Sequence, residues 1–309
     1  MAALPQHSLH TLRDRVARVV RQTLAGTPDE PVYDYDPTEE RRFSPDSAIW
    51  EVHTDVSMLI GGLRALLLQT LHPLALAGVT QHSTYRSDPL GRLQRTGAFI
   101  ATTTFGTTTE AEQVISMVRA VHARVNGVAS DGRPYSALDP HLLAWVHCTE
   151  ADSFLRARQR YGTTPLAESR ADEYVAQIGQ IGEALGVVDP PQSREELRQR
   201  LLSYRDELTV GPDTRETVRF LAFPPLSLAA RPSYGVIFAA AASMLPGFAR
   251  RMLMIPVAPL AEPIAIRPAA TGLMRTLNWA LGEHPAVLAA REGTSGGQPS
   301  SKNAETHES

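Results

Sequence analysis

The sequence predicts an all-α protein built from a single multi-helix domain. Apolar residues recur at intervals of three and four in one segment after another, as on the buried face of an amphipathic helix. Several of these segments follow an Asp-Pro pair or a capping-box pattern, and both patterns mark helix starts. No stretch alternates clearly between apolar and polar residues as a half-buried strand does, and no G-x-G-x-x-G motif occurs.

The first predicted elements are an amphipathic helix at residues 9–24 and, after a proline- and acid-rich loop, a strongly apolar stretch at residues 56–79. This stretch is long enough to cross a bilayer, but Arg64 and Gln69 interrupt it and Pro73 breaks it. A charge near the middle of a membrane span costs about 2.5 to 3.5 kcal/mol. We therefore predict a buried, kinked helix pair.

The later helices are delimited by their start signals. Asp88 and Pro89 open a helix that runs to about Thr104, and Thr107 with Glu110 has capping-box spacing for the next one. Further helices are predicted after Asp139 and Pro140, at residues 169–186, at residues 194–208 behind a Ser193–Glu196 capping box, and in the small-residue stretch beyond Pro224 and Pro225.

Length and composition set the domain boundaries. A chain of 309 residues with 43% hydrophobic residues can bury one large core. We expect an N-terminal helix and loop at residues 1–40, the main helical domain at 41–275, and a C-terminal extension at 276–309. The polar composition after about residue 292 predicts disorder there.

Charge and the rare residue types exclude several functions. The net charge of -3 and the lack of a long basic block argue against nucleic-acid binding. Cys148 is the only cysteine, which excludes an intramolecular disulfide, a CxxC zinc module and covalent heme attachment. Lys302 is the only lysine and lies in the polar tail, which excludes Schiff-base catalysis and a P-loop.

No signal-peptide pattern opens the chain, so we expect a cytoplasmic protein, and no particular oligomeric state is indicated.

Two neighbouring helices carry candidate functional side chains. In the stretch "MVRAVHARV", His122 lies on an apolar stripe with Ile115 and Val118, where it is either a hydrogen-bonded core residue or a metal ligand. On the preceding helix Arg92, Arg95 and Thr96 share one face, which is either a solvated arginine face or an anion clamp. The aromatic residue Phe99 continues that face. Together the two helices contain the elements of a heme site, an imidazole and propionate-binding arginines.

The helix after Asp139 offers a rival ligand. His147 and Glu150 are three residues apart, so they can share a metal, which suits a non-heme iron or zinc site if another helix adds ligands. His147 is also an alternative axial ligand of a heme, or a hydrogen-bonding group in the pocket. His72 and His82 fit either a pocket wall or helix-end and loop positions.

An ordered series of motifs supports the heme interpretation. The stretches "LLLQTLHPLALAGV", "HSTYRSDPLGRLQRT", "VRAVHARVNG" and "YSALDPHLLAWVHCTEADSF" resemble the MpaB-type oxygenases, whose relatives include the rubber-cleaving latex clearing proteins. The resemblance covers roughly residues 45–250. It implies a helical protein with a globin-like core that binds heme b non-covalently and uses dioxygen.

The resemblance also assigns roles to individual residues. His122 matches the proximal iron ligand, while Arg92, Arg95 and Thr96 match an arginine, a lysine and a threonine beside the heme. Arg95 therefore replaces a distal lysine, and the upstream catalytic carboxylate of the rubber-cleaving proteins has no evident match. These departures argue against rubber cleavage and leave a heme-dependent oxygenase that acts on a hydrophobic or bulky organic substrate, with Arg95 and Thr96 as its catalytic residues.

A competing class is a non-enzymatic helical protein that binds a partner or the membrane surface. The apolar segments at residues 56–79 and 234–260 and the pair Arg250 and Arg251 would fit such a protein without a cofactor. Peripheral membrane contact is therefore kept as an expectation.

Overall fold

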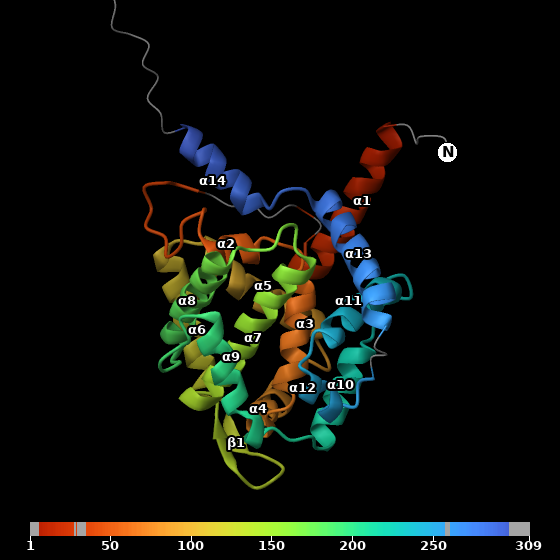
Figure 1. Ribbon diagram of the computed structural model, residues 1–309. Coiled ribbons are helices and arrows are strands. Elements are labelled where there is room, and N and C mark those ends of the chain that lie inside the picture. Colours follow the sequence, from red (N-terminus) through yellow and green to blue (C-terminus); the bar gives the residue numbers. More distant parts are fainter. Residues whose placement is uncertain (1–5, 28, 30–34, 257–259, 297–309) are drawn as a thin grey trace, which may run out of the picture.

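The computed structural model describes residues 6–27, 29, 35–256 and 260–296. Within these residues the protein is almost entirely helical, and its sheet is one small two-stranded hairpin. The predicted all-α class is therefore confirmed. Figure 1 shows α1 and α14 at one end of the molecule and the hairpin at the opposite end.

The helices and strands follow one another in this order: α1 (Gln6–Ala25), α2 (Ala48–His53), α3 (Met58–Gln69), α4 (Pro73–His82), α5 (Pro89–Phe105), α6 (Thr108–His122), β1 (Asn126–Val128), β2 (Pro134–Ser136), α7 (Pro140–Tyr161), α8 (Glu168–Leu185), α9 (Arg194–Ser203), the 3-10 turn η1 (Arg205–Glu207), α10 (Pro212–Ala222), α11 (Arg231–Ser243), α12 (Gly247–Met252), the π-helical turn η2 (Glu262–Ile266), α13 (Arg267–Leu281) and α14 (Pro285–Gly296).

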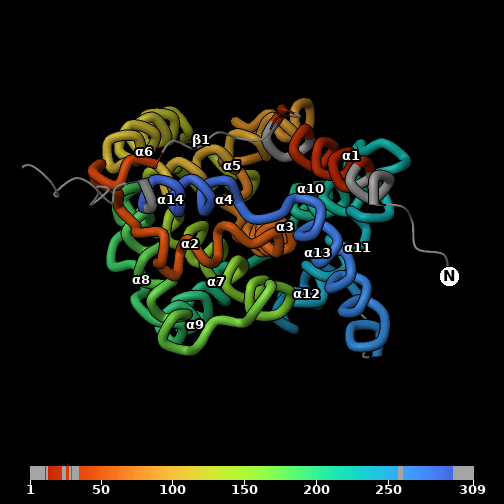
Figure 2. Tube along the Cα trace, turned by 90° about the horizontal axis from the view of Figure 1, so that it is seen from above, coloured from red at the N-terminus to blue at the C-terminus, as the bar shows by residue number. Residues whose placement is uncertain are grey.

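Helices α3 and α7 form the centre of the molecule. In Figure 2 they lie between α6, α8 and α9 on one side and α1, α11 and α13 on the other. The two central helices approach closely because α3 has Gly61 at the contact, where a Cβ would come within 3.0 Å of the Phe154 backbone. Arg64 of α3 is fully buried and forms a 2.7 Å ion pair with Asp152 of α7. Removing Asp152 would leave the Arg64 charge buried without a carboxylate partner, whereas Asp152 also pairs with Arg156 at 2.8 Å.

Helix α7 contributes to both large hydrophobic clusters. The first cluster contains Trp50 of α2, Phe154 of α7 and Tyr174 of α8. The second contains Trp145 of α7 and Tyr204 after α9, and extends over α3, α11 and α13. The long apolar run in the α7 sequence is thus explained by burial on several sides of this helix.

The predicted helix starts are confirmed where the signal is local. Asp88 accepts a hydrogen bond from a backbone N–H in the first turn of α5, and Asp139 does the same for α7. Thr107 and Glu110 form the complete capping box of α6. Each of these side chains satisfies a backbone donor that the helix itself leaves unpaired.

Three details differ from the prediction. Ser193 caps α9, but the Glu196 carboxylate accepts the N–H of Gln192 instead of that of Ser193, so the capping box is incomplete. The predicted helix at 194–208 ends at Ser203 and continues as η1. The hairpin of β1 and β2 was not predicted, because strands of three residues are too short to show alternation.

The apolar stretch at residues 56–79 forms the predicted kinked pair. Helices α3 and α4 are bent by 108° at the break before Pro73, and most of α3 is buried. Among the described residues no single helix is long and apolar enough to cross a membrane, although this bent pair reaches the required length and composition. At the C-terminal end, α14 includes residues 292–296 of the segment expected to be disordered, and the rest of that segment lies outside the described residues.

Candidate functional site

The arginine face of α5 divides between the interior and the surface. Arg92 is partly buried, and its Nη1 donates to Ser83 Oγ at 2.9 Å. Arg95 is exposed and forms a 3.1 Å ion pair with Asp88 at the start of its own helix. The exposed Thr96 donates its hydroxyl hydrogen to the Arg92 carbonyl at 3.0 Å. The structure thus places Arg92 alone of these three toward the interior.

Glu150, in the middle of α7, is the carboxyl that interacts electrostatically with Arg92. Burial raises the pKa of the Glu150 carboxyl to about 7, although the Arg92 guanidinium and the nearby Gln69 side chain act in the opposite direction. Burial likewise lowers the pKa of Arg92, an effect that Glu150 counters. The two groups therefore influence each other electrostatically, and the carboxyl gains or loses its proton near neutral pH.

Behind Glu150 lies a hydrogen-bonded chain that the sequence did not reveal. Tyr174 of α8 is fully buried and interacts electrostatically with Glu150. Its hydroxyl lies 3.4 Å from His53 Nε2, and His53 Nδ1 lies 2.7 Å from the hydroxyl of Thr104. Residues from α2, α5, α7 and α8 meet here, so no local spacing could have brought them together.

His122 is at the C-terminal end of α6, and its ring is partly buried. Its Nδ1 atom is fully enclosed and has no hydrogen-bond partner. Burial lowers the pKa of His122, so the ring is neutral at physiological pH. A neutral imidazole is the form that binds a metal ion.

His147 lies on α7 and faces α8. Its ring packs directly on Gly182, where a Cβ would come within 3.0 Å of three ring atoms. Burial lowers the pKa of His147 to about 4, so this ring is also neutral at physiological pH. Helix α8 contacts both α6 and α7, and Arg119 of α6 donates to the Ala184 carbonyl on α8. His122 and His147 therefore lie on two helices that share α8 as a neighbour.

These two histidines differ from the other histidines whose side chains the structure describes. In each ring of His53, His72, His82, His141 and His284, at least one nitrogen has a hydrogen-bond partner. No hydrogen bond to His122 or His147 is found within the part of the chain that the structure describes. Of their ring nitrogens, His122 Nδ1 is fully enclosed without a partner, which is costly and leaves this atom as a candidate ligand.

The structure also describes the surroundings of Phe99 and Cys148. Phe99 is partly buried and packs on the cluster that contains Trp50, so it lies on the inner side of α5. Cys148 is a buried free thiol, and burial raises its pKa to about 12, which keeps it protonated. Within the described residues, three metal-ligating side chains come together at His72, His141 and Glu207, and no third such residue joins His147 and Glu150.

Comparison with known proteins identifies the family to which this chain belongs. Residues 50–279 match the family model described as ER-bound oxygenase mpaB/B'/Rubber oxygenase, catalytic domain. Two uncharacterized proteins, from Mycobacterium bovis and Mycobacterium tuberculosis, are each 29% identical over 173 residues, which is 53% of this chain and 66% of each relative. No solved structure matches significantly. The family match spans most of the chain, including every helix that positions Arg92, His122, His147 and Glu150, and the chain therefore belongs to the family of mpaB-type and rubber oxygenase catalytic domains.

Proposed function

We propose that this protein is a heme b-dependent oxygenase that uses dioxygen to oxidise a hydrophobic or otherwise bulky organic substrate. Membership of an oxygenase family supports the reaction class. The observation that carries the cofactor is the absence of any hydrogen-bond partner, among the described residues, for His122 and His147. Each neutral ring has a lone pair that can bind iron.

The residue types carried by α5 and α6, which pack on one another, suit a heme. Non-covalent heme needs an axial imidazole, apolar walls and cations beside its propionates. The neutral His122 ring supplies the first, Phe99 and the apolar side of α6 supply walls, and Arg92 supplies a partly buried positive charge. When bound, the heme supplies the oxygen chemistry, while the protein supplies position and electrostatics.

The chain's own residues then divide the remaining tasks. His122 would hold the iron, and Arg92 would pair with a propionate. Glu150, with a pKa of about 7, holds or releases a proton inside the pocket. We assign Arg95 and Thr96 to the part of the site where dioxygen would react, as its catalytic residues. For Arg95 this role requires its guanidinium to leave the Asp88 carboxylate, an exposed pair whose loss costs little.

The absorption spectrum of the purified protein tests the proposal. We expect a Soret band at about 400 nm, and the spectrum of the pyridine hemochrome should identify the heme as heme b. His122→Ala removes the axial imidazole, so the band should be lost, whereas Arg95→Ala should keep the heme and change its ligand binding. His82→Ala is the matched control, since that ring is already bonded to Asn126 and Tyr135. Retention of the band in His122→Ala together with its loss in His147→Ala would assign the iron to His147.

A non-heme metal site on His147 and Glu150 is the second candidate, supported by the lack of a hydrogen-bond partner for His147 and by the nearby carboxyl. Its weakness is that no third ligand joins the two among the described residues. A protein that contains stoichiometric iron or zinc, lacks a Soret band, and loses the metal in both His147→Ala and Glu150→Gln would favour this candidate over heme.

Peripheral membrane contact is a further proposal, supported by exposed apolar side chains in the C-terminal half of the chain. Phe223, Leu228, Met254 and Ile264 are each exposed by more than two thirds of their surface, from 69% to 82%. Such residues enter a membrane surface readily when arginines lie nearby. Co-sedimentation with anionic liposomes that is lost in Phe223→Ser with Leu228→Ser would support this contact, and equal sedimentation of both proteins would refute it.

A further inference from the structure

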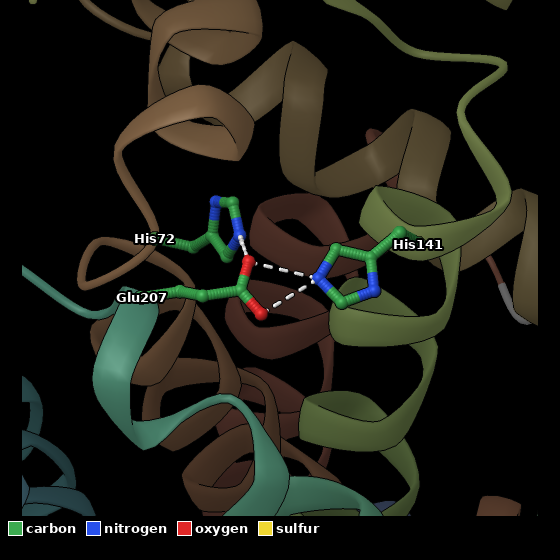
Figure 3. Close-up of side chains that lie close together, drawn as sticks. All are labelled: His72, His141 and Glu207. Atoms are coloured by element: carbon green, nitrogen blue, oxygen red, sulfur yellow. Dashed lines mark hydrogen bonds and ion pairs between the residues drawn. The ribbon is translucent and has the colours of Figure 1, made fainter.

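A second group of metal-ligating side chains lies away from the site described above. His72 is the residue before α4, His141 is in the first turn of α7, and Glu207 ends η1. Figure 3 shows both imidazole rings turned toward the Glu207 carboxylate. His141 Nε2 lies 2.9 and 2.8 Å from the two carboxylate oxygens, and His72 Nε2 lies 3.4 Å from one of them.

His72, the most buried of the three residues, has a ring nitrogen that lacks a hydrogen-bond partner. His72 is only 1% exposed, and its Nε2 atom is fully enclosed without a hydrogen-bond partner. The rings of Trp145 and Tyr204 enclose it, each with its centroid about 6 Å away. A buried imidazole nitrogen aimed at a carboxylate and a second imidazole indicates that a ligand belongs between them.

The three side chains are held in place by contacts outside the cluster. The Tyr204 hydroxyl donates to the His141 carbonyl at 2.8 Å, so the segment before η1 is fixed to the start of α7. After η1, the Thr209 N–H donates to the Leu71 carbonyl at 2.9 Å, next to His72. The cluster is thus assembled before any ligand binds, which lowers the entropic cost of binding.

We propose that His72, His141 and Glu207 form a binding site for a divalent transition-metal ion of the zinc type. Two imidazole nitrogens and one carboxylate are a donor set typical of zinc, whereas calcium and magnesium prefer oxygen ligands. Tetrahedral bonds of ~2.0–2.1 Å place the ligand atoms about 3.3 Å apart, close to the present separations. His141 is 51% exposed and Glu207 is 38% exposed, which leaves the fourth position open to water.

Binding requires one proton rearrangement. At present His72 Nδ1 accepts the Ala75 N–H at 3.4 Å, a long bond that places the ring proton on Nε2. When Nε2 binds a metal, the single proton of the neutral ring moves from Nε2 to Nδ1, so Nδ1 no longer accepts the Ala75 N–H and this bond is lost. The start of α4 keeps the stronger 2.9 Å bond from the Leu76 N–H to the His72 carbonyl.

One nearby cation, Arg133, would repel a bound metal ion, but an ion pair offsets its charge. Arg133 interacts electrostatically with both His72 and Glu207. Its guanidinium is paired with Asp131 at 2.7 Å, on the same hairpin turn. The site lies one and a half turns or more from His147 along α7, about 9 Å by helical rise, so it is separate from the proposed heme pocket.

Metal titration of tag-free protein tests the proposal. After chelator treatment and dialysis, Zn²⁺ is added under calorimetry, bound zinc is measured by elemental analysis, and Co²⁺ is added to a second sample for its visible spectrum. We expect one tight equivalent per chain and the absorption of tetrahedral cobalt. His141→Gln and Glu207→Gln should each weaken this equivalent by about tenfold or more. His82→Gln, whose ring lies outside the cluster, should leave it unchanged.

The controls separate this site from the proposed heme. Chelator treatment should leave any Soret band intact, because porphyrin iron is not removed by it, so the two proposals fail independently. His141 and Glu207 are surface residues, and their variants should fold, as circular dichroism will verify. Absence of zinc binding, or binding of equal strength in wild type, His141→Gln and Glu207→Gln, would overturn the inference.

Discussion

Replacing Glu150 with glutamine should make the protein more stable at alkaline pH. The carboxyl has a pKa of about 7 in the folded protein, against an ordinary value of 4.5. The folded state therefore binds more protons than the unfolded state between these two values, and stability falls as the pH rises from about 4.5 to 7. Below about pH 4.5 both states are protonated, so the loss is absent there. Above about pH 7 the loss is complete.

The size of the effect follows from the same shift. At about 1.36 kcal/mol for each unit of pKa, the change from 4.5 to about 7 corresponds to about 3 kcal/mol. This figure is an upper limit, because the Glu150 side chain keeps some accessible surface and solvent reduces the cost of its charge. Glu150→Gln keeps the shape of the side chain and removes the charge, so the variant should gain up to ~3 kcal/mol over wild type between pH 5 and pH 8.

Urea denaturation at pH 5, 6, 7 and 8 measures this difference. The matched control is Glu183→Gln on α8, an exposed glutamate whose replacement should leave the pH dependence of unfolding unchanged. If wild type and Glu150→Gln lose stability in parallel from pH 5 to pH 8, the carboxyl is not desolvated in the folded protein. The assigned role of Glu150 as a proton-holding group would then be wrong.

Three further substitutions test the packing that holds the site. Gly61→Ala places a methyl group against the Phe154 backbone, so unfolding by urea should show a loss of about 1–3 kcal/mol. Asp152→Ala leaves the Arg64 charge buried without its partner, and the same assay should show a loss of about 3–5 kcal/mol; an unchanged midpoint would mean that water reaches Arg64. Thr107→Ala removes the cap of α6 and should cost about 1 kcal/mol, with earlier loss of helical circular dichroism on heating.

The sequence predicted those features that depend on neighbouring residues. The caps Asp88 and Thr107 were found because a capping side chain bonds to a backbone N–H within one turn. The bend between α3 and α4 was found because Pro73 cannot donate a backbone hydrogen bond.

The sequence could not predict how side chains on one face choose their partners. Arg92 and Arg95 have helical spacing for a shared clamp, yet Arg95 turns to Asp88, which lies at the start of the same helix and offers a nearer carboxylate. The group at His72, His141 and Glu207 joins three separate segments and leaves no local spacing to detect. The same holds for the hydrogen-bonded chain from Tyr174 through His53 to Thr104, since only the packing of three helices brings it together.

Helix α7 carries residues of each of the sites described. It carries His141 in its first turn, His147 and Glu150 in its middle, and Asp152 at the ion pair with α3. An α-helix is stiff along its axis and rises about 1.5 Å per residue, so the distances between these groups are fixed whatever the surrounding loops do. A metal ion bound at His141 would therefore hold the start of α7 in place, and with it the Glu150 carboxyl, roughly 13 Å further along the helix axis.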